Sequence, residues 1–397
     1  MKNFLNTRAT PALRLSAMTA LLLAFTGQAL AAPDADGGVT GLQQLLTGKL
    51  VGSGDTRAPI ARPGADPGAM VNEWLKAPLT AEAAVRIALL NNPGLQVSLA
   101  SAGVGLSDAV SSPSLARLKA QQTITRLSAD ARKAWIEAVA AAQSARYMLE
   151  AKEATEAGGE LARRMTQVGN MSKLQQAREQ VMLSDAAVQL TRAQQTAFNA
   201  REKLIVTLGL WGPQTRFELP SELPALPPQA QDLPDIETRV LKENGDLRLA
   251  QAQWQRKLAN PRPASADALW DAMGDAATVR ELAIKTRSEA RQTYNNYRTA
   301  YDLARHYRDE VVPLRKFIND EVVLRYNGML LSVFDLLADT RAQVLGANSA
   351  IEAQRDFWLA EADLQSVLAG VPAEIASGAS GARSAGGTAG GAAAAAH

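Results

Sequence analysis

The feature that most constrains the fold is an internal repeat, because three segments of the first half return in the same order in the second half. The matched pairs are residues 92–97 (NPGLQV) with 244–249 (NGDLRL), 167–172 (QVGNMS) with 325–332 (RYNGMLLS), and 178–181 (REQV) with 341–344 (RAQV). The spacing between partners changes little along the chain, so only small insertions separate the two halves. A repeat with so long a period indicates one structural unit used twice, here a long helical hairpin.

Long stretches without proline flank a proline-rich centre. Six prolines lie between Pro213 and Pro234, which predicts a stiff, extended connector between the two halves. No proline occurs in residues 114–212, 264–312 or 314–371. These stretches are rich in alanine, glutamine, arginine, glutamate and leucine, which favour long helices.

Apolar residues at coiled-coil spacing run through the predicted helices. Leu337, Val344, Ile351 and Trp358 follow one another at intervals of seven. Many positions between them are alanine or polar, so the seams are narrow and we expect the helices to pack side by side in a larger array. A single helix over residues 116–167 would be about 80 Å long, and its Gly-Gly pair is a place where it could bend.

The two ends of the chain are predicted to lie outside this fold. Lys2, Arg8 and Arg14 accompany a short apolar run, and residues 29–31 (ALA) match a cleavage site, which together indicate a secretory signal peptide. We therefore expect export into a bacterial periplasm. The predicted organisation is a signal peptide (1–31), a disordered lead-in (32–72), a first helical repeat (73–212), a Pro-rich connector (213–235), a second helical repeat (236–372) and a disordered Gly/Ala tail (373–397).

Composition argues against several classes of function. The chain has no cysteine, which excludes disulfides, thiolate metal sites and a lipidated N-terminal cysteine. Its formal charge of +2 falls to about −1 without the signal peptide, so no basic excess points to nucleic acid. The only histidines are His306 and His397, and no metalloprotease, phosphate-loop or serine-hydrolase motif occurs. We expect no enzyme activity, no cofactor, no metal site and no nucleic-acid partner.

Each predicted hairpin has one break, where a glycine is followed by a capping signal. Gly169 precedes an S-x-x-Q box at residues 172–175, and Gly328 precedes an S-x-x-D box at residues 332–335. We expect each glycine to end one helix and each serine to start the next. The turns are either plain helix turns or a functional end of the hairpins, since both halves place the same turn at the far end.

Three segments and the paired turns resemble the TolC-type outer-membrane efflux proteins. The segments are residues 79–85 (LTAEAAV), 88–95 (ALLNNPGL) and 204–210 (LIVTLGL). The resemblance covers about residues 79–370. It implies a homotrimer in which each protomer gives two long hairpins to a twelve-helix tunnel across the periplasm. The turns would then lie at the inner end, where the tunnel meets a periplasmic adaptor protein and an inner-membrane efflux pump.

The chain departs from this family where the tunnel would enter the outer membrane through a twelve-stranded barrel. Each half of a family member carries two membrane strands, and such a strand needs about 9–11 residues of alternating polarity. Here residues 108–115 lead straight into the next helix, and residues 260–278 show no alternation. The sequence therefore predicts an all-α fold of duplicated long antiparallel helical hairpins, a TolC-like α-barrel protomer without the membrane β-strands.

The resemblance also marks residues at the turns. Tyr326 matches a tyrosine at the family's constriction, and Asp335 matches the first of two aspartates at the tunnel mouth, the second being Ala338 here. Lys173 stands at the position of the family's gate acid and could pair with Asp335 from a neighbouring hairpin. The alternative is that Asp335 only caps a helix and Lys173 is a solvated surface residue. The candidate gate and adaptor-docking residues are Gly169, Ser172, Lys173, Tyr326, Gly328, Ser332 and Asp335.

Two functions remain open at this point. The resemblance favours a TolC-like component of a tripartite efflux system, forming a periplasmic helical duct with an adaptor and an inner-membrane pump. The missing strands favour a barrel-less periplasmic coiled-coil protein that binds efflux or envelope components without conducting. In both cases we expect an exported protein of the periplasm, associated with the outer membrane by resemblance.

Overall fold

The computed structural model describes residues 67–102, 115–259 and 266–372, together with residues 42, 43, 46, 59 and 60. Every regular element in these ranges is a helix, and none of these helices is both long and apolar enough to cross a membrane. The predicted signal peptide, most of the predicted lead-in and the Gly/Ala tail lie outside the described residues.

The lead-in differs from the predicted disorder at the positions that are described. Leu42, Leu46 and Ile60 are buried in the core of the first repeat, although glycine and proline are frequent around them in the sequence. Burial removes their apolar side chains from water, which favours a folded lead-in at these positions. Helix α2 (Gly68–Trp74) also begins before residue 73, the predicted start of the first repeat. Part of the lead-in is therefore folded against the first helical repeat.

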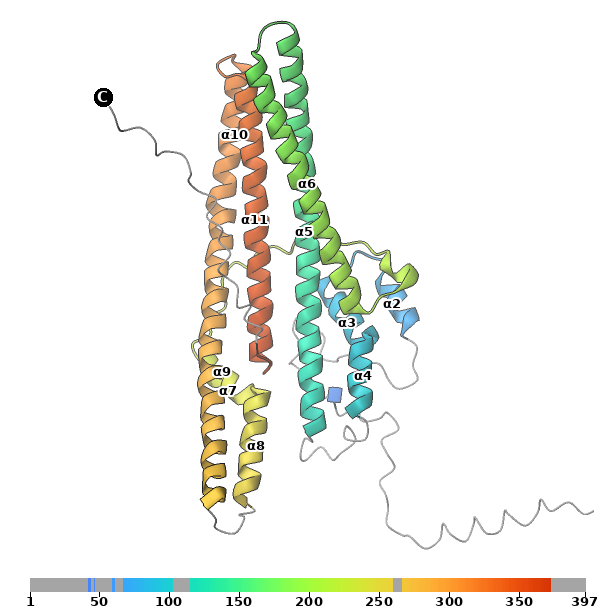
Figure 1. The fold of residues 1–397 in the computed structure, drawn as a ribbon, viewed down its shortest axis with the longest axis vertical. Helices are drawn as coiled ribbons and strands as arrows, with labels where there is room; N and C mark the ends of the chain where they lie inside the picture. Colours follow the sequence, from blue (N-terminus) through green and yellow to red (C-terminus); the bar gives the residue numbers. More distant parts are fainter. Residues whose placement is uncertain are drawn as a thin grey trace, which may run out of the picture.

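Two long helical hairpins run side by side, with both turns at the same end of the molecule (Figure 1). The first hairpin consists of α5 (Leu115–Gln167) and α6 (Lys173–Leu208). The second consists of α9 (Ala266–His306), a π-helical turn (Tyr307–Val311), α10 (Val312–Asn327) and α11 (Val333–Leu368). The predicted all-α fold of duplicated antiparallel hairpins is confirmed.

The four long helices form one layer. Helix α5 packs against α6 and α11, and α11 packs in turn against α9 and α10. The order across the layer is therefore α6, α5, α11 and then α9–α10. Helix α5 continues as one helix through Gly158 and Gly159, so the possible bend at this pair does not interrupt it. The absence of a side chain at Gly158 instead admits Leu337 of α11, whose Cδ1 lies 2.8 Å from where a Cβ would stand.

The repeat extends to the short helices at the other end of each hairpin. In the first half these are α3 (Ala81–Asn91) and α4 (Pro93–Ala102), which pack on α5; in the second they are α7 (Ile236–Glu243) and α8 (Gly245–Ala259), which pack on α9. Asn92 and Asn244 start α4 and α8 in the same way, accepting a hydrogen bond from the N–H three residues on, at 2.9 and 2.8 Å. The matched asparagines of the sequence are therefore matched helix caps.

In each repeat, one glycine in the left-handed conformation follows the last helix. Gly209 follows α6 with a φ of +68°, and Gly370 follows α11 with a φ of +89°. Each abuts the joint between the two short helices of its own repeat. A Cβ at Gly209 would lie 2.7 Å from the Asn91 carbonyl oxygen, and one at Gly370 would lie 2.1 Å from the Glu243 carbonyl oxygen. Both positions therefore require glycine for close approach as well as for conformation.

The buried apolar residues gather in the half of the layer away from the turns. One cluster joins α3, α5 and the end of α6, with Ile87, Ile136 and Leu204 among its members. The other joins α7, α9 and α11 around Tyr297 and Phe357, whose ring centroids are 5.7 Å apart. No residue of α10 is buried, and α11 has no buried residue before its middle. Burial therefore holds the turn end of the hairpins much less firmly.

The Pro-rich connector, residues 213–235, crosses the layer as a strap. An extended, proline-rich backbone makes no hydrogen bonds within itself, so the carbonyl and N–H groups of the strap are available to other partners. Side chains from the long helices form hydrogen bonds with these groups. In layer order the contacts are Arg201 of α6 with the Phe217 carbonyl (2.6 Å), Gln143 of α5 with the Leu223 N–H (3.4 Å), Trp358 of α11 with the Pro224 carbonyl (3.0 Å), and Tyr301 of α9 with the Pro228 carbonyl (2.9 Å). The strap thus fixes the order of the four helices.

Candidate functional site

The first hairpin turn closes α5 with a hydrogen-bond pattern that reverses the chain. The Gly169 N–H donates to the Thr166 carbonyl at 3.1 Å, and the Asn170 N–H donates to the Met165 carbonyl at 2.8 Å. Gly169 has a φ of +79°, the left-handed conformation that this type of helix end requires. The expectation that Gly169 ends the helix is confirmed.

The second turn has the same pattern, but its left-handed residue is Met329 and not Gly328. The Met329 N–H donates to the Tyr326 carbonyl at 2.9 Å, and the Leu330 N–H donates to the Arg325 carbonyl at 2.9 Å. Met329 has a φ of +59°, whereas Gly328 has a φ of −79°. Gly328 is the residue at which α10 ends, as expected. The sequence pairing of Gly169 with Gly328 is nevertheless one residue out, because in both turns the residue three before the capping serine takes the left-handed conformation.

Both predicted capping boxes are confirmed. Ser172 Oγ accepts from the Gln175 N–H at 3.2 Å, and Gln175 Oε1 accepts from the Ser172 N–H at 3.2 Å. Ser332 Oγ accepts from the Asp335 N–H at 3.2 Å, and Asp335 Oδ2 accepts from the Ser332 N–H at 3.1 Å. Two otherwise unpaired N–H groups are satisfied at the start of each returning helix. The two turns are therefore rigid at their serine side and equivalent in construction.

The charged candidates do not meet within one protomer. Asp335 accepts from both the N–H and the hydroxyl of Ser332, the latter at 2.7 Å, so it acts there as a helix cap. Lys173, the first residue of α6, is exposed, and no ion pair joins it to Asp335 in the described part of the protomer. Tyr326 is partly exposed one residue before α10 ends. A charge pair between Lys173 and Asp335 would have to form between protomers.

Sequence reasoning missed the most conspicuous feature of the turns, which is their exposed apolar side chains. Met329 is 94% exposed and Leu330 is 76% exposed, and Val168 and Leu174 are exposed beside the first turn. Apolar residues gathered at one end of a molecule are typical of a binding surface. The available signal was the presence of large apolar residues next to the glycine and serine, at positions where turns usually carry polar ones.

A polar cluster precedes the first turn on the surface of α5. Arg163 and Arg164 donate to the Glu160 carboxylate at 2.9 and 2.8 Å, and these hydrogen bonds lower the pKa of Glu160 from 4.5 to about 2. All three side chains are largely exposed and lie on one helix. The cluster therefore stays charged at neutral pH without linking the two hairpins.

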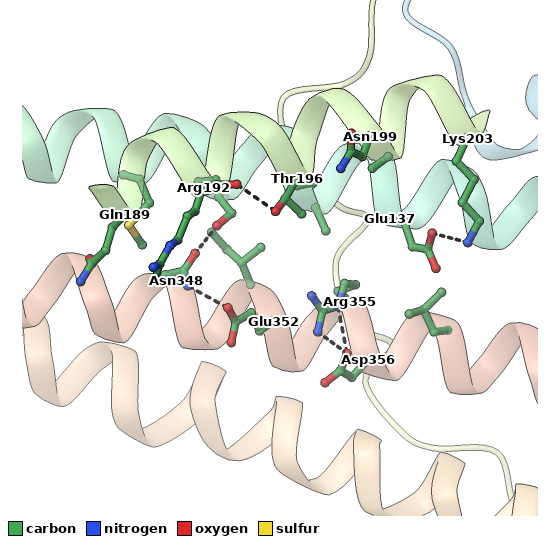
Figure 2. Close-up of a pocket in the computed structure, with 18 of the residues that line it drawn as sticks. Glu137, Gln189, Arg192, Thr196, Asn199, Lys203, Asn348, Glu352, Arg355 and Asp356 are labelled. Atoms are coloured by element: carbon green, nitrogen blue, oxygen red, sulfur yellow. Dashed lines mark hydrogen bonds and ion pairs between the residues drawn. The ribbon is translucent and has the colours of Figure 1, made fainter. Parts of the chain in front are cut away.

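A groove of about 790 Å³ separates α6 from α11 above α5 (Figure 2). Its floor is mostly apolar and small, as at Ala140 and Ala141 of α5. Charges of both signs line its sides, including an ion pair of Lys203 with Glu137 at 2.7 Å. No group of three or more histidine, aspartate or glutamate side chains among the described residues could hold a metal ion. The groove is therefore an open surface lined by small apolar and charged side chains.

Taken together, the duplicated hairpins, the strap across them and the equivalent turns define a duplicated, all-helical layer. No protein-family model matches the chain, and no curated protein matches it either.

Solved structures show the fold. The chain is similar to CusC, with a TM-score of 0.56 and 13% sequence identity over 73% of this chain and 95% of that one. It is also similar to the outer-membrane channel OprN, with a TM-score of 0.53 and 15% identity over 71% and 72% of the two chains. The Campylobacter jejuni CmeC outer membrane channel gives a TM-score of 0.50 and 12% identity over 70% and 68%. The predicted TolC-like resemblance is confirmed at the level of the fold.

Proposed function

We propose that this protein is the duct-forming component of a tripartite efflux system. Three copies would close into a twelve-helix tube in the periplasm, in contact with the outer membrane. The hairpin turns would form the inner end of the tube, where a periplasmic adaptor and an inner-membrane pump dock. The fold shared with outer-membrane channels supports this role, and the number of copies follows from the resemblance to the TolC type.

The observation that carries the proposal is a pair of unpartnered apolar stripes at opposite edges of the layer. On α6, Leu174, Val181 and Val188 are exposed at intervals of seven. On the other edge, Phe317 and Leu324 of α10 are exposed with the same spacing. Stripes of this period are coiled-coil seams that lack a partner helix. Because α5 and α11 separate the two edges within a protomer, only another copy can bring them together.

Joining two different edges gives a head-to-tail interface, which either closes into a ring or continues as a filament. The proposed tube is the closed case. The exposed apolar residues at the turns, Met329 and Leu330 above all, then lie around one mouth of the ring and support docking of a partner there. Asp335 of one copy and Lys173 of the next would also approach at this mouth.

Disulfide crosslinking tests the edge-to-edge contact directly, since the native chain has no cysteine. Val181 on α6 and Phe317 on α10 lie at similar distances from the turn end. The double variant Val181→Cys/Phe317→Cys should give, on oxidation, a ladder that ends at three chains. Each single variant can give at most a dimer and is the matched control. A double variant that stays monomeric under oxidation at micromolar concentration would contradict the proposal.

A second candidate is a periplasmic helical protein that binds efflux or envelope components without conducting. The observation that favours it is that α9 begins at Ala266, so residues 266–278, which the sequence pattern leaves without strand alternation, are helical. Expression of the full chain in a strain that lacks its own duct protein separates the two candidates. Restored drug resistance supports the duct, and a crosslinked trimer without restored resistance supports the second candidate.

A further inference from the structure

At the end opposite the turns, the second hairpin extends further than the first. Helix α9, the π-helical turn and α10 follow one another without interruption and have 41, 5 and 16 residues, whereas α5, their counterpart in the first hairpin, has 53. The second run is therefore longer by about 13 Å at 1.5 Å per residue. Figure 1 shows α8 and the start of α9 reaching beyond α4 and α5 at this end. Among the described residues, the start of α9 and its partner α8 project furthest from the turns.

Three large apolar side chains are exposed on this projecting part. Leu269, Trp270 and Met273 lie in the first two turns of α9 and are 73%, 65% and 59% exposed. With 3.6 residues per turn, these positions share one face of the helix. We call these three residues the tip patch. An apolar face of this kind at the extreme end of a molecule is typical of a contact surface.

The opposite side of the same helical turns is acidic. Asp267, Asp271 and Asp275 recur at every fourth residue, which places them in one stripe that faces away from the tip patch. Asp275 accepts from Lys257 of α8 at 2.6 Å, so α8 packs on the acidic side and leaves the tip patch open. Asp267 and Asp271 are exposed at the projecting end.

In the proposed ring, the described helices of a neighbouring copy end short of the tip patch. Copies related by rotation about the axis of the tube keep the same height along it. Helix α6, the other edge of the layer, starts at the turns and has 36 residues, so it ends about 39 Å before the level at which α9 begins. Helices α4 and α5 also end before that level (Figure 1). The three tip patches of a ring therefore lie in one plane at its end, where a broad flat partner can contact all of them together.

We propose that the tip patch inserts into the surface of a phospholipid bilayer, at the boundary between the headgroups and the acyl chains. Tryptophan is enriched at this boundary, because its ring is apolar while its N–H still reaches polar groups. A helix face enters such an interface by about 5–10 Å, which the projection of α9 beyond α5 allows. The insertion deepens the proposed function and rests on it only for the direction in which this end points, toward the outer membrane.

The acidic stripe indicates which kind of lipid surface fits. When the tip patch is inserted, Asp267 and Asp271 lie at the level of the headgroups. Neutral phospholipids such as phosphatidylcholine carry an ammonium group there, which attracts a carboxylate, whereas anionic headgroups repel it. A neutral phospholipid surface is therefore the expected partner.

Quenching of tryptophan fluorescence by brominated phosphatidylcholine tests the contact, because bromine on the acyl chains quenches only rings that reach them. The full chain, with a hexahistidine tag added after His397, is held on vesicles of this lipid that also contain a little nickel-chelating lipid. The tether makes a weak contact measurable and does not require a ring to form. Residues 373–397 can span up to about 80 Å, more than the distance of about 39 Å between the levels at which α11 ends and α9 begins.

Two exposed tryptophans provide a matched pair of variants. The native chain should be quenched on brominated vesicles relative to unbrominated ones. Trp270→Phe should remove this quenching, whereas Trp211→Phe should retain it, although Trp211 is 77% exposed and thus even more accessible than Trp270. A native chain without quenching, quenching that persists in Trp270→Phe, or quenching that is lost in Trp211→Phe would overturn the proposal.

A second pair of variants separates the tip patch from the rest of its helix face. Leu269→Gln/Met273→Gln should remove most of the quenching of Trp270, because the apolar area that inserts is lost. Ile284→Gln should leave the quenching unchanged, since Ile284 is 60% exposed but lies about 21 Å from Trp270 along α9, nearer the turns. An equal loss in both variants would show that the contact is not made by the tip and would overturn the proposal.

The lipid composition tests the assignment of a neutral surface. Replacing part of the phosphatidylcholine with phosphatidylglycerol should weaken the quenching, and stronger quenching would overturn that assignment. Unchanged helicity by circular dichroism shows that the variants fold. The tethered measurement does not depend on the Val181→Cys/Phe317→Cys crosslink, so a failure of the tip patch and a failure of the ring give different results.

Discussion

Replacing Met329 with glycine is expected to stabilise the protein. Met329 has a φ of +59° and is 94% exposed, so the side chain strains the backbone and contributes almost no packing. A left-handed conformation costs an L-residue about 1–2 kcal/mol. Glycine removes that cost, but it also increases the conformational entropy of the unfolded chain, which lowers the free energy of unfolding by about 0.4–1 kcal/mol. The expected balance is a gain of about 0.5–1 kcal/mol in the free energy of unfolding.

Urea denaturation followed by circular dichroism measures this gain, with Gly169→Ala as the matched reverse change. Gly169 occupies the equivalent place in the first turn with nothing within 4 Å of an added Cβ, so its substitution isolates the conformational cost. Gly169→Ala should destabilise by about 1 kcal/mol. If Met329→Gly proved neutral or destabilising while Gly169→Ala destabilised as expected, the argument that Met329 is strained would be refuted. A strained apolar residue kept at an exposed tip would in turn point to a role in binding.

Three further predictions concern the turns, the joints and the strap. Gly370→Ala should lower the free energy of unfolding by at least about 2 kcal/mol, because its Cβ would meet the Glu243 carbonyl in a left-handed conformation; a loss below that in urea denaturation would contradict the close approach. Asp335→Asn should leave Tm nearly unchanged, since the amide oxygen can still cap α11, but should alter the cation sensitivity of the proposed duct; a large fall in Tm would show that the charge itself is structural. Burial raises the pKa of Tyr297 above its ordinary value of 10. The stability that its neutral hydroxyl contributes is therefore present below pH 10 and is lost as the pH rises through the higher pKa of the folded state. Tyr297→Phe should flatten the fall in the free energy of unfolding at alkaline pH, and an identical fall in the variant would count against this assignment.

The sequence predicted the features that depend on local chemistry. Proline-free stretches predicted the long helices, and the S-x-x-Q and S-x-x-D patterns predicted the capping boxes at Ser172 and Ser332, because each depends on residues within one turn of helix. The repeat predicted two equivalent hairpins. It could not place the left-handed residue of the second turn, because glycine is the residue normally expected in that conformation, whereas Met329, the residue after Gly328, adopts it.

The features that depend on residues far apart in the chain could not be predicted. Nothing in the sequence shows that Trp358, counted in a coiled-coil stripe, donates to the strap 134 positions earlier. The Gly-Gly pair suggested a bend in α5, whereas Gly158 makes room for Leu337 and Arg341 of another hairpin. Both contacts arise only when the layer is assembled, so helix propensity and periodicity do not contain them.

In the proposed assembly, the two open edges of the layer meet between copies and close a ring. Cryo-electron microscopy of the oxidised Val181→Cys/Phe317→Cys full chain, averaged in end-on views, tests it most directly. A closed ring of twelve helix densities, four from each of three copies, is expected. Open filaments, or compact particles in which α6 and α10 do not meet between copies, would contradict it.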